Sequence, residues 1–273
     1  MKVKSEDAYF MILKWLHNDY APPQIALTIR LIRKENIAKA INALLEIGSI
    51  LFEAVSDKDG NVIPERYEKL SAFILYHWEG TFTLRRSIIN ALCNFYNSSF
   101  VLLRCSLDTL LDGLFYQCLC QRRFRESKVL DEIDHCDLKR LVDALKELLK
   151  EEPSESKHLE KNSAHIFDLL DEFPKYKPKP SAMYRLLSKW GLFAPIERPE
   201  RLIAGIYGKL SFSVHQHYSS LDIGRAIIEG KEIFEYPSPF LEKSIKEYLE
   251  LYNQISKLWI TSEINLLEFT SER

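Results

Sequence analysis

The chain has 273 residues, of which 46% are hydrophobic and 28% are charged, and its formal net charge is −2 at pH 7. These values are ordinary for a globular protein, and they exclude a global basic field that would recruit nucleic acid or acidic membranes. Any basic site must therefore be local.

From the sequence we expect neither a targeting segment nor a membrane span. Its first residues, MKVKSEDAYFMILKW, lack the long apolar run and small-residue cleavage site of a signal peptide. The longest charge-free run, from Ser87 to Leu103, is too short and too rich in Asn and Ser to cross a bilayer. The five cysteines are odd in number and lie mostly in apolar helical sequence, so we expect free thiols and a cytoplasmic protein.

Apolar residues recur every three or four positions almost throughout, and only nine residues are glycine. This periodicity predicts an all-α, multi-helix bundle. We expect an N-terminal helical section over residues 1–62 and a main bundle over residues 63–273, although the two could form one continuous domain. The expected helices cover residues 5–17, 22–33, 36–55, 64–78, 81–97, 98–122, 137–151, 157–172, 182–190, 199–218, 221–230 and 238–270.

Within the N-terminal section, residues 38–61 can be interpreted as a recognition helix followed by a hairpin wing, as in winged-helix DNA-binding domains. Local positive charge comes from Arg30, Arg33, Lys34 and Lys39. However, no clear helix-turn-helix turn precedes this segment, and Pro64 falls in the wing. An ordinary helical hairpin explains the same sequence.

The loop from Asp57 to Glu68 carries acidic or amide residues at positions 1, 3, 5 and 12 of an EF-hand calcium loop. Val62 stands where glycine is needed for the sharp turn, and Pro64 follows two residues later. An Asp-Gly turn between two helices explains the same residues better. We therefore expect no tightly bound calcium.

The helix expected over residues 98–122 is apolar on nearly every side, yet it carries Arg104, Asp108 and Asp112. Charges four residues apart lie along one stripe of a helix. Because buried charges need partners, polar groups of another helix, water in a cleft or a ligand must meet this stripe. We expect Arg104 and Asp108 to be largely buried and paired, and Arg104→Leu to lower the free energy of unfolding by about 3–5 kcal/mol.

Cys118, Cys120, His135 and Cys136 are residue types that bind zinc. Their C-x-C and H-C spacings differ from the usual ligand spacings, and adjacent residues rarely face one metal ion. Buried thiols explain them better. The sequence thus predicts no zinc and, more generally, no metal or cofactor.

Two segments, residues 121–128 and 175–190, combine basic side chains with aromatic ones. Such combinations can grip single-stranded nucleic acid, because the bases stack on the rings and the phosphates meet the cations. A run of charges is more often a solvated face. Both interpretations stay open.

In the helix expected over residues 199–218, Ser211 and His215 are four residues apart and share a face. Histidine titrates near neutral pH and is the usual acid–base residue in catalysis. The alternative is a helix end whose histidines cap carbonyl groups or pack on aromatic rings.

Two elements together resemble the helical HEPN-like proteins, especially uncharacterised members and those of the abortive-infection type. The first is the N-x-S-F-x-L-L-R-x-x-L-D helix that contains Arg104 and Asp108, and the second is the later helix that ends L-S-x-x-V-H at His215. The resemblance covers residues 73–225 and implies an α-helical bundle, often dimeric, with RNA-binding or RNA-cleaving activity in defence or stress. The Arg-spacer-His motif of active members is absent, and Asp108 replaces the commoner Glu.

The resemblance implies a division of roles among four residues. In an active protein, His215 would accept a proton from a ribose 2′-hydroxyl, Arg104 would offset charge on the phosphate, and Asp108 or Ser211 would orient them. The rival hypothesis is a non-catalytic protein-interaction module, in which the charged stripe fixes the helix register. Whether the protein is an enzyme stays open at this point.

The helix expected over residues 238–270 carries more apolar positions than one narrow stripe would need. Such a helix can face both its own core and a partner. Together with the frequent pairing of HEPN-like proteins, this spread predicts a homodimer.

Overall fold

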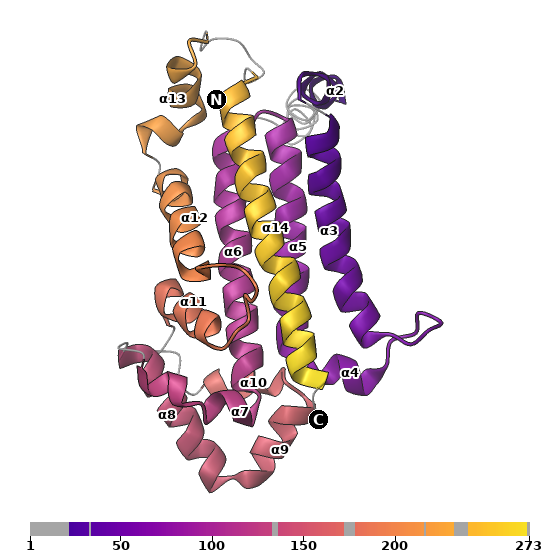
Figure 1. Ribbon diagram of the computed structural model, residues 1–273, viewed down its shortest axis with the longest axis vertical. Helices are drawn as coiled ribbons and strands as arrows, with labels where there is room; N and C mark the ends of the chain where they lie inside the picture. The colour runs from indigo at the N-terminus through magenta and orange to yellow at the C-terminus, as the bar shows by residue number, and fades with distance from the viewer. Residues whose placement is uncertain are drawn as a thin grey trace, which may run out of the picture.

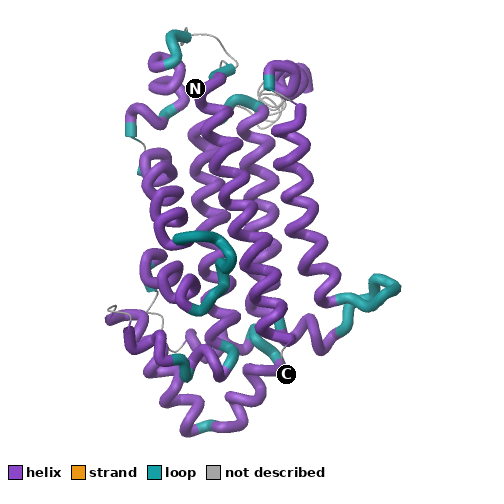
Figure 2. The backbone as a smooth tube through the Cα atoms, viewed as in Figure 1, coloured by secondary structure: helices purple, strands orange, loops and turns teal. Residues whose placement is uncertain are grey.

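The computed structural model describes residues 22–32, 34–132, 136–171, 178–215, 217–231 and 240–271. Within these ranges the elements are α-helices and 3₁₀ turns, apart from one isolated bridge between Ser56 and Val62. The prediction of an all-α, multi-helix bundle is confirmed (Figure 1 and Figure 2). In the described part of the chain, no helix is both long and apolar enough to cross a membrane.

Four long helices form the body of the protein: α3 (Lys34–Val55), α5 (Ser71–Leu92), α6 (Tyr96–Leu119) and α14 (Glu242–Ser271). Around the bundle, α5 contacts α6, α6 contacts α14, α14 contacts α3 and α3 contacts α5 (Figure 1). Helices α5 and α14 are therefore diagonal partners whose side chains meet across the core. Since α3 contributes Ile47 and Leu51 to the same core as α14, the described part of the N-terminal section packs with the main bundle.

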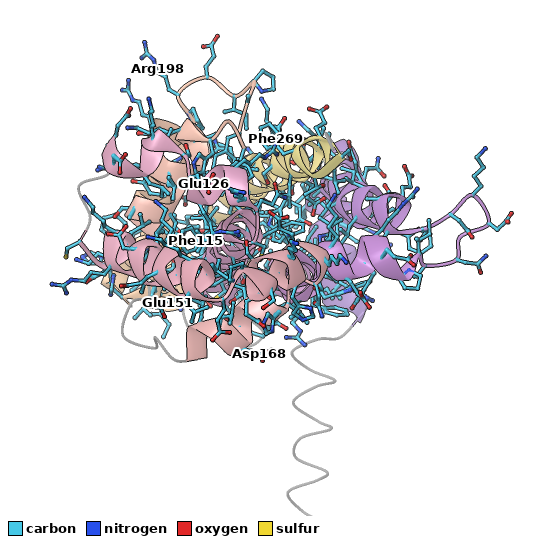
Figure 3. All side chains as sticks on the ribbon, turned by 90° about the horizontal axis from the view of Figure 1, so that it is seen from below. Phe115, Glu126, Glu151, Asp168, Arg198 and Phe269 are labelled. Carbon is cyan, nitrogen blue, oxygen red and sulfur yellow. The ribbon has the colours of Figure 1, made fainter. Side chains whose placement is uncertain are left out.

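Shorter helices cover one side and both ends of these four. Helices α11 and α12 pack on α6, and α7 to α10 cap the lower end of the bundle in Figure 1. Figure 3 views this cap from below, with Glu126, Glu151 and Asp168 labelled on it. The shorter elements are α2 (Pro22–Leu31), α4 (Pro64–Lys69), α7 (Arg122–Arg125), η1 (Lys128–Glu132), α8 (Cys136–Glu151), α9 (Pro153–Lys161), α10 (His165–Asp171), α11 (Pro180–Lys189), α12 (Pro199–Val214), η2 (Tyr218–Ser220) and α13 (Asp222–Ile228).

The predicted helix boundary near Gly80 is wrong. The chain breaks at Leu70 instead, and α5 continues through Gly80 to Leu92. A Cβ atom at position 80 would overlap with the indole ring of Trp259 from α14. Glycine is needed there for the close approach of two diagonal helices, not to end a helix.

Two other predicted boundaries differ from the structure. The helix expected over residues 157–172 is divided into α9 and α10, because the backbone N–H of Ser163 leaves the helix to donate to the carbonyl of Glu68 at 3.0 Å. The helix expected over residues 182–190 begins earlier, at Pro180 of α11, since proline in the first turn of a helix loses no hydrogen bond. The helix expected over residues 5–17 lies outside the described residues.

Most of the wide apolar set of α14 is buried within this chain, although Ile264 is exposed. Ile245, Leu249, Leu251, Ile255 and Leu258 are all buried in the bundle core. They are divided among three neighbouring helices, α3, α5 and α6. Burial within the chain therefore accounts for most of the spread of apolar positions on α14, and the homodimer stays a prediction.

Candidate functional site

The charged stripe of α6 meets α12 along a line that we call the α6–α12 seam, formed by Arg104, Asp108, Tyr207 and Ser211. The two helices run antiparallel, because Arg104 contacts Ser211 while Asp108, one turn later on α6, contacts Tyr207, one turn earlier on α12. The seam therefore joins the two helices on which the HEPN-like resemblance rests.

Arg104 makes three contacts in the seam. Its Nε donates to Asp108 Oδ2 at 3.1 Å, and its Nη1 donates to Ser211 Oγ at 3.3 Å. Its guanidinium carbon also lies 3.8 Å from the centroid of the Tyr207 ring. A cation over an aromatic face is stabilised electrostatically, so the Tyr207 ring helps to hold the guanidinium in place.

Asp108 is shared between the two helices. While Oδ2 accepts from Arg104, Oδ1 accepts a hydrogen bond from the hydroxyl of Tyr207 at 2.5 Å. Burial raises the pKa of Tyr207, and the charge of Asp108 raises it further. The phenol therefore stays protonated and donates its hydrogen bond to Asp108.

The expected pairing of Arg104 and Asp108 is found, both with each other and with the later helix. The expected burial is found for Arg104, whose side chain is 20% exposed, but it is wrong for Asp108, whose side chain is 38% exposed. Both groups lie at the edge of the helix contact rather than inside it. A charge pair that reaches solvent is less costly to break than a buried one.

Asp112 is the buried end of the stripe, with 8% of its surface exposed. It lies near Tyr76 and Tyr116. Burial, and then the charge of Asp112, raise the pKa of Tyr116 to about 12. The stripe thus runs from the core at Asp112 to the solvent-accessible edge at Arg104.

His215 lies next to the seam but does not join it. It is exposed and ends α12, and its backbone N–H donates to the carbonyl of Ser211 at 2.9 Å. One helical turn, or about 6 Å of axis, separates it from Ser211. Among the described residues, no contact joins the imidazole to Arg104. The structure therefore brings Arg104, Asp108 and Ser211 together and leaves His215 one turn away.

Sequence reasoning missed Tyr207, which contacts both charged members of the seam. Its position four residues before Ser211, on the same helical face, was the available signal. Tyr184 of α11 stacks on the Tyr207 ring, with centroids 6.1 Å apart and the planes at 28°. A tyrosine of the basic segment 175–190 is thus packed at the seam, while residues 175–177 of that segment lie outside the described residues.

The EF-hand-like loop forms a turn that uses its own carboxylate. Asp57 Oδ1 accepts from the backbone N–H groups of Asp59 and Asn61 at 2.9 and 2.8 Å. These hydrogen bonds lower the pKa of Asp57. The turn interpretation is confirmed, and the loop projects from the bundle between α3 and α4 (Figure 2).

Of the three cysteines expected to be buried thiols, two are buried and one is exposed. Cys118 and Cys120 are buried, and the Cys120 thiol donates to the carbonyl of Ser163, whereas Cys136 is exposed and His135 lies outside the described residues. Over the described ranges, no group of three or more His, Cys, Asp or Glu side chains is arranged to hold a metal ion.

A second feature of interest is a basic hollow of about 580 Å³ between α7, α8 and α9. Arg125, one of its lining residues, is buried and donates to the carbonyl of Leu119 at 2.7 Å and to Ser156 Oγ at 3.0 Å. Two glutamates also face the hollow, so five basic and two acidic side chains leave it with an excess of three positive charges. The charged side chains that line it are Arg122, Arg125, Lys146, Lys150, Lys157, Glu126 and Glu160.

The seam offers a held cation, a hydroxyl and, one turn away, an exposed imidazole. These are groups that can bind a phosphate diester and move a proton on it. Neither the family models, nor the curated proteins, nor the solved structures gave a match to this chain.

Proposed function

We propose that this is a HEPN-like helical protein that binds RNA and cleaves it at the α6–α12 seam. The observation that carries the proposal is the contact between Arg104 and Ser211. It joins the two helices that resemble HEPN-like proteins. It also leaves Arg104 partly exposed beside the C-terminal turn of α12. A cytoplasmic location belongs to the proposal, since free cysteines suit a reducing compartment.

The chemistry would be a transfer within the RNA strand. His215 would take the proton of a ribose 2′-hydroxyl, and the 2′-oxygen would then attack the adjacent phosphorus. The bond from phosphorus to the 5′-oxygen would break, leaving a 2′,3′-cyclic phosphate, and the 5′-oxygen would take a proton from water. Arg104 would offset the charge that develops on the phosphate oxygens.

The basic hollow supports RNA binding away from the seam. It lies beyond the C-terminal end of α6, which continues from Arg104 to Leu119 over a rise of about 23 Å. An extended strand could contact both places at once. The seam would then supply the chemistry and the hollow most of the phosphate contacts.

Binding is tested by fluorescence anisotropy with unstructured single-stranded RNA in EDTA, between 50 and 200 mM salt. Replacement of Lys146 and Lys150 by Glu should weaken binding and reduce its dependence on salt. Lys58→Glu, in the exposed turn between α3 and α4, is the matched control and should bind as the wild type does. Equal affinity of all three proteins would rule out the hollow as an RNA site.

Cleavage is tested separately, with the same RNA and without metal. His215→Ala should abolish product formation but leave the affinity unchanged. His217→Ala is the control, because this nearby histidine is also exposed and packs on Phe212. Cleavage that persists in His215→Ala would remove the catalytic assignment, and a 3′-hydroxyl product would contradict the transfer to the 2′-oxygen.

The second candidate is a non-catalytic protein-interaction module, and one observation favours it. Three groups of the chain already hold the Arg104 guanidinium: Asp108, Tyr207 and Ser211. In that case the seam only fixes α12 against α6. Absence of RNA binding and cleavage, combined with a destabilised Arg104→Leu variant, would support this function.

The N-terminal section does not favour DNA binding. The exposed stripe of its helix α3 is apolar, with Ile41, Leu45 and Phe52, whereas a DNA-binding surface needs exposed basic side chains.

A further inference from the structure

The outer face of α5 is apolar, and no described part of the chain covers its large apolar side chains. The opposite face of this helix carries His77, Gly80 and Ser87, which meet α14 across the core. On the outer face, four large apolar side chains have exposed fractions between 39% and 55%. They are Leu75, Trp78, Phe82 and Ile89.

Three charged residues, Glu79, Arg85 and Arg86, lie on the same outer face of α5, and all three are exposed. Within the described residues, none of the three forms an ion pair, although each lies beside an apolar side chain. With 100° per residue, Glu79 and Arg86 fall on one flank of the apolar stripe, and Trp78 and Arg85 fall on the other.

The positions on this face are symmetric about Phe82. Leu75 precedes Phe82 by seven residues and Ile89 follows it by seven, while Glu79 precedes it by three and Arg86 follows it by four. When two copies of a helix pack antiparallel about a two-fold axis, each flank faces the same flank of the other copy in reverse order. The face of α5 is therefore complementary to itself.

We propose that two copies of this chain pair through α5, with the helices antiparallel and the two-fold axis passing next to Phe82. The two Phe82 rings then meet at the centre. Leu75 packs against Ile89 of the second copy, and Glu79 pairs with Arg86 of the second copy. On the other flank, Arg85 lies over the ring of the second copy's Trp78, a cation–π contact. This pairing does not depend on the proposed activity toward RNA.

A hollow beside the stripe fits this arrangement. It has a volume of about 360 Å³ and is lined by Leu75, Tyr76, Glu79, Thr109 and Phe167, mostly through apolar atoms. In the proposed pair, the C-terminal half of α5 from the second copy lies over this hollow. On the other side of the stripe, the exposed apolar residues of α3, including Phe52, extend the surface that the pair would bury.

The test is the mass of the full chain in solution, measured by light scattering and by sedimentation over a hundredfold range of concentration. The wild type should be a dimer at the upper end. Glu79→Arg and Arg86→Glu should each raise the dissociation constant about tenfold or more, because each places like charges opposite one another. The double variant should restore the dimer. Residues seven apart do not touch within one helix, so only pairing between copies explains the rescue.

A crosslink tests the two-fold axis directly. Phe82→Cys, in a chain whose exposed Cys105 and Cys136 are replaced by Ser, should form a disulfide-linked dimer under mild oxidation. Ile264→Glu, on the exposed side of α14, is the control and should stay dimeric. A monomer at every concentration, or a double charge exchange without rescue, overturns the proposal. If deletion of residues 1–21 turned such a monomer into a dimer, those residues would be the occupant of this face, and the proposal for the full chain would be wrong.

Discussion

His77 Nδ1 and Glu263 Oε1 lie 2.6 Å apart in the centre of the bundle, where each side chain is at most 2% exposed. The pair joins the diagonal helices α5 and α14. The second oxygen of the carboxyl group, Oε2, has no hydrogen-bond partner among the described side chains. Burial raises the pKa of Glu263, and the hydrogen bond with His77 opposes this shift only in part.

This pair predicts an unusual response to Glu263→Gln. Because the pKa of Glu263 is higher in the folded chain than in the unfolded chain, its contribution to stability is full below the unfolded pKa and is lost as pH rises through the folded value. Glutamine keeps a hydrogen bond to His77 and does not titrate. The variant should therefore gain stability relative to the wild type as pH rises from about 4.5 to 8.

Urea unfolding of both proteins across this pH range checks the prediction. Glu263→Ala is the contrasting variant and should lose about 2–4 kcal/mol, since it leaves a cavity and an unpartnered His77. A stability difference between the Gln variant and the wild type that does not change with pH would contradict the assigned shift.

The seam predicts a moderate cost for Arg104→Leu. Asp108 is more than one-third exposed and keeps the hydrogen bond from Tyr207, so the carboxylate is not left buried and alone. We expect a loss of about 1–2 kcal/mol in the free energy of unfolding, below the value that full burial would give. Tyr207→Phe should lose about 0.5–1.5 kcal/mol. Tyr184→Phe, which keeps the stacked ring, serves as the control, and thermal melts of the three variants would decide.

Gly80 predicts a sensitive contact between α5 and α14. Gly80→Ala places a methyl group into the Trp259 ring and should cost about 1–3 kcal/mol through overpacking. Gly205 lies within α12, and no neighbouring atom comes within 4 Å of the place that a methyl group would take there. Gly205→Ala should therefore gain up to about 1 kcal/mol from helix propensity. Equal melting temperatures for the two alanine variants would show that the bundle adapts to the methyl group.

His165 predicts a second pH dependence, at the α9–α10 corner. Burial lowers the pKa of His165, but hydrogen bonds with Glu155 and Asp168 outweigh it and raise the pKa above its ordinary value. The stabilising contribution is thus full below the unfolded pKa and is lost as pH rises through the folded pKa. The stability advantage of the wild type over His165→Asn should fall between about pH 6 and 8. NMR titration of the imidazole would check the direction independently.

Periodicity was sufficient to predict the fold class, because apolar spacing reflects which side of a helix is buried. It did not locate the break at Leu70 or the continuity through Gly80, since both depend on α14, a helix far away in sequence. The partners of Arg104 were predictable in kind, as polar groups of the later helix. The shallow burial of Asp108 could not be predicted, because its exposure depends on how the edges of α6 and α12 align.

The position of α14 in the fold has a consequence for biosynthesis. This helix follows every other described helix in the chain, yet it supplies one of the four sides of the core and buries Trp259, Tyr252 and Leu258. While a ribosome is still translating residues 240–271, the inner faces of α3, α5 and α6 lack their final cover. The nascent chain must keep these surfaces from aggregating for several seconds at ordinary elongation rates of about 5–20 residues per second. Chaperone binding during synthesis should therefore persist until α14 has left the ribosome.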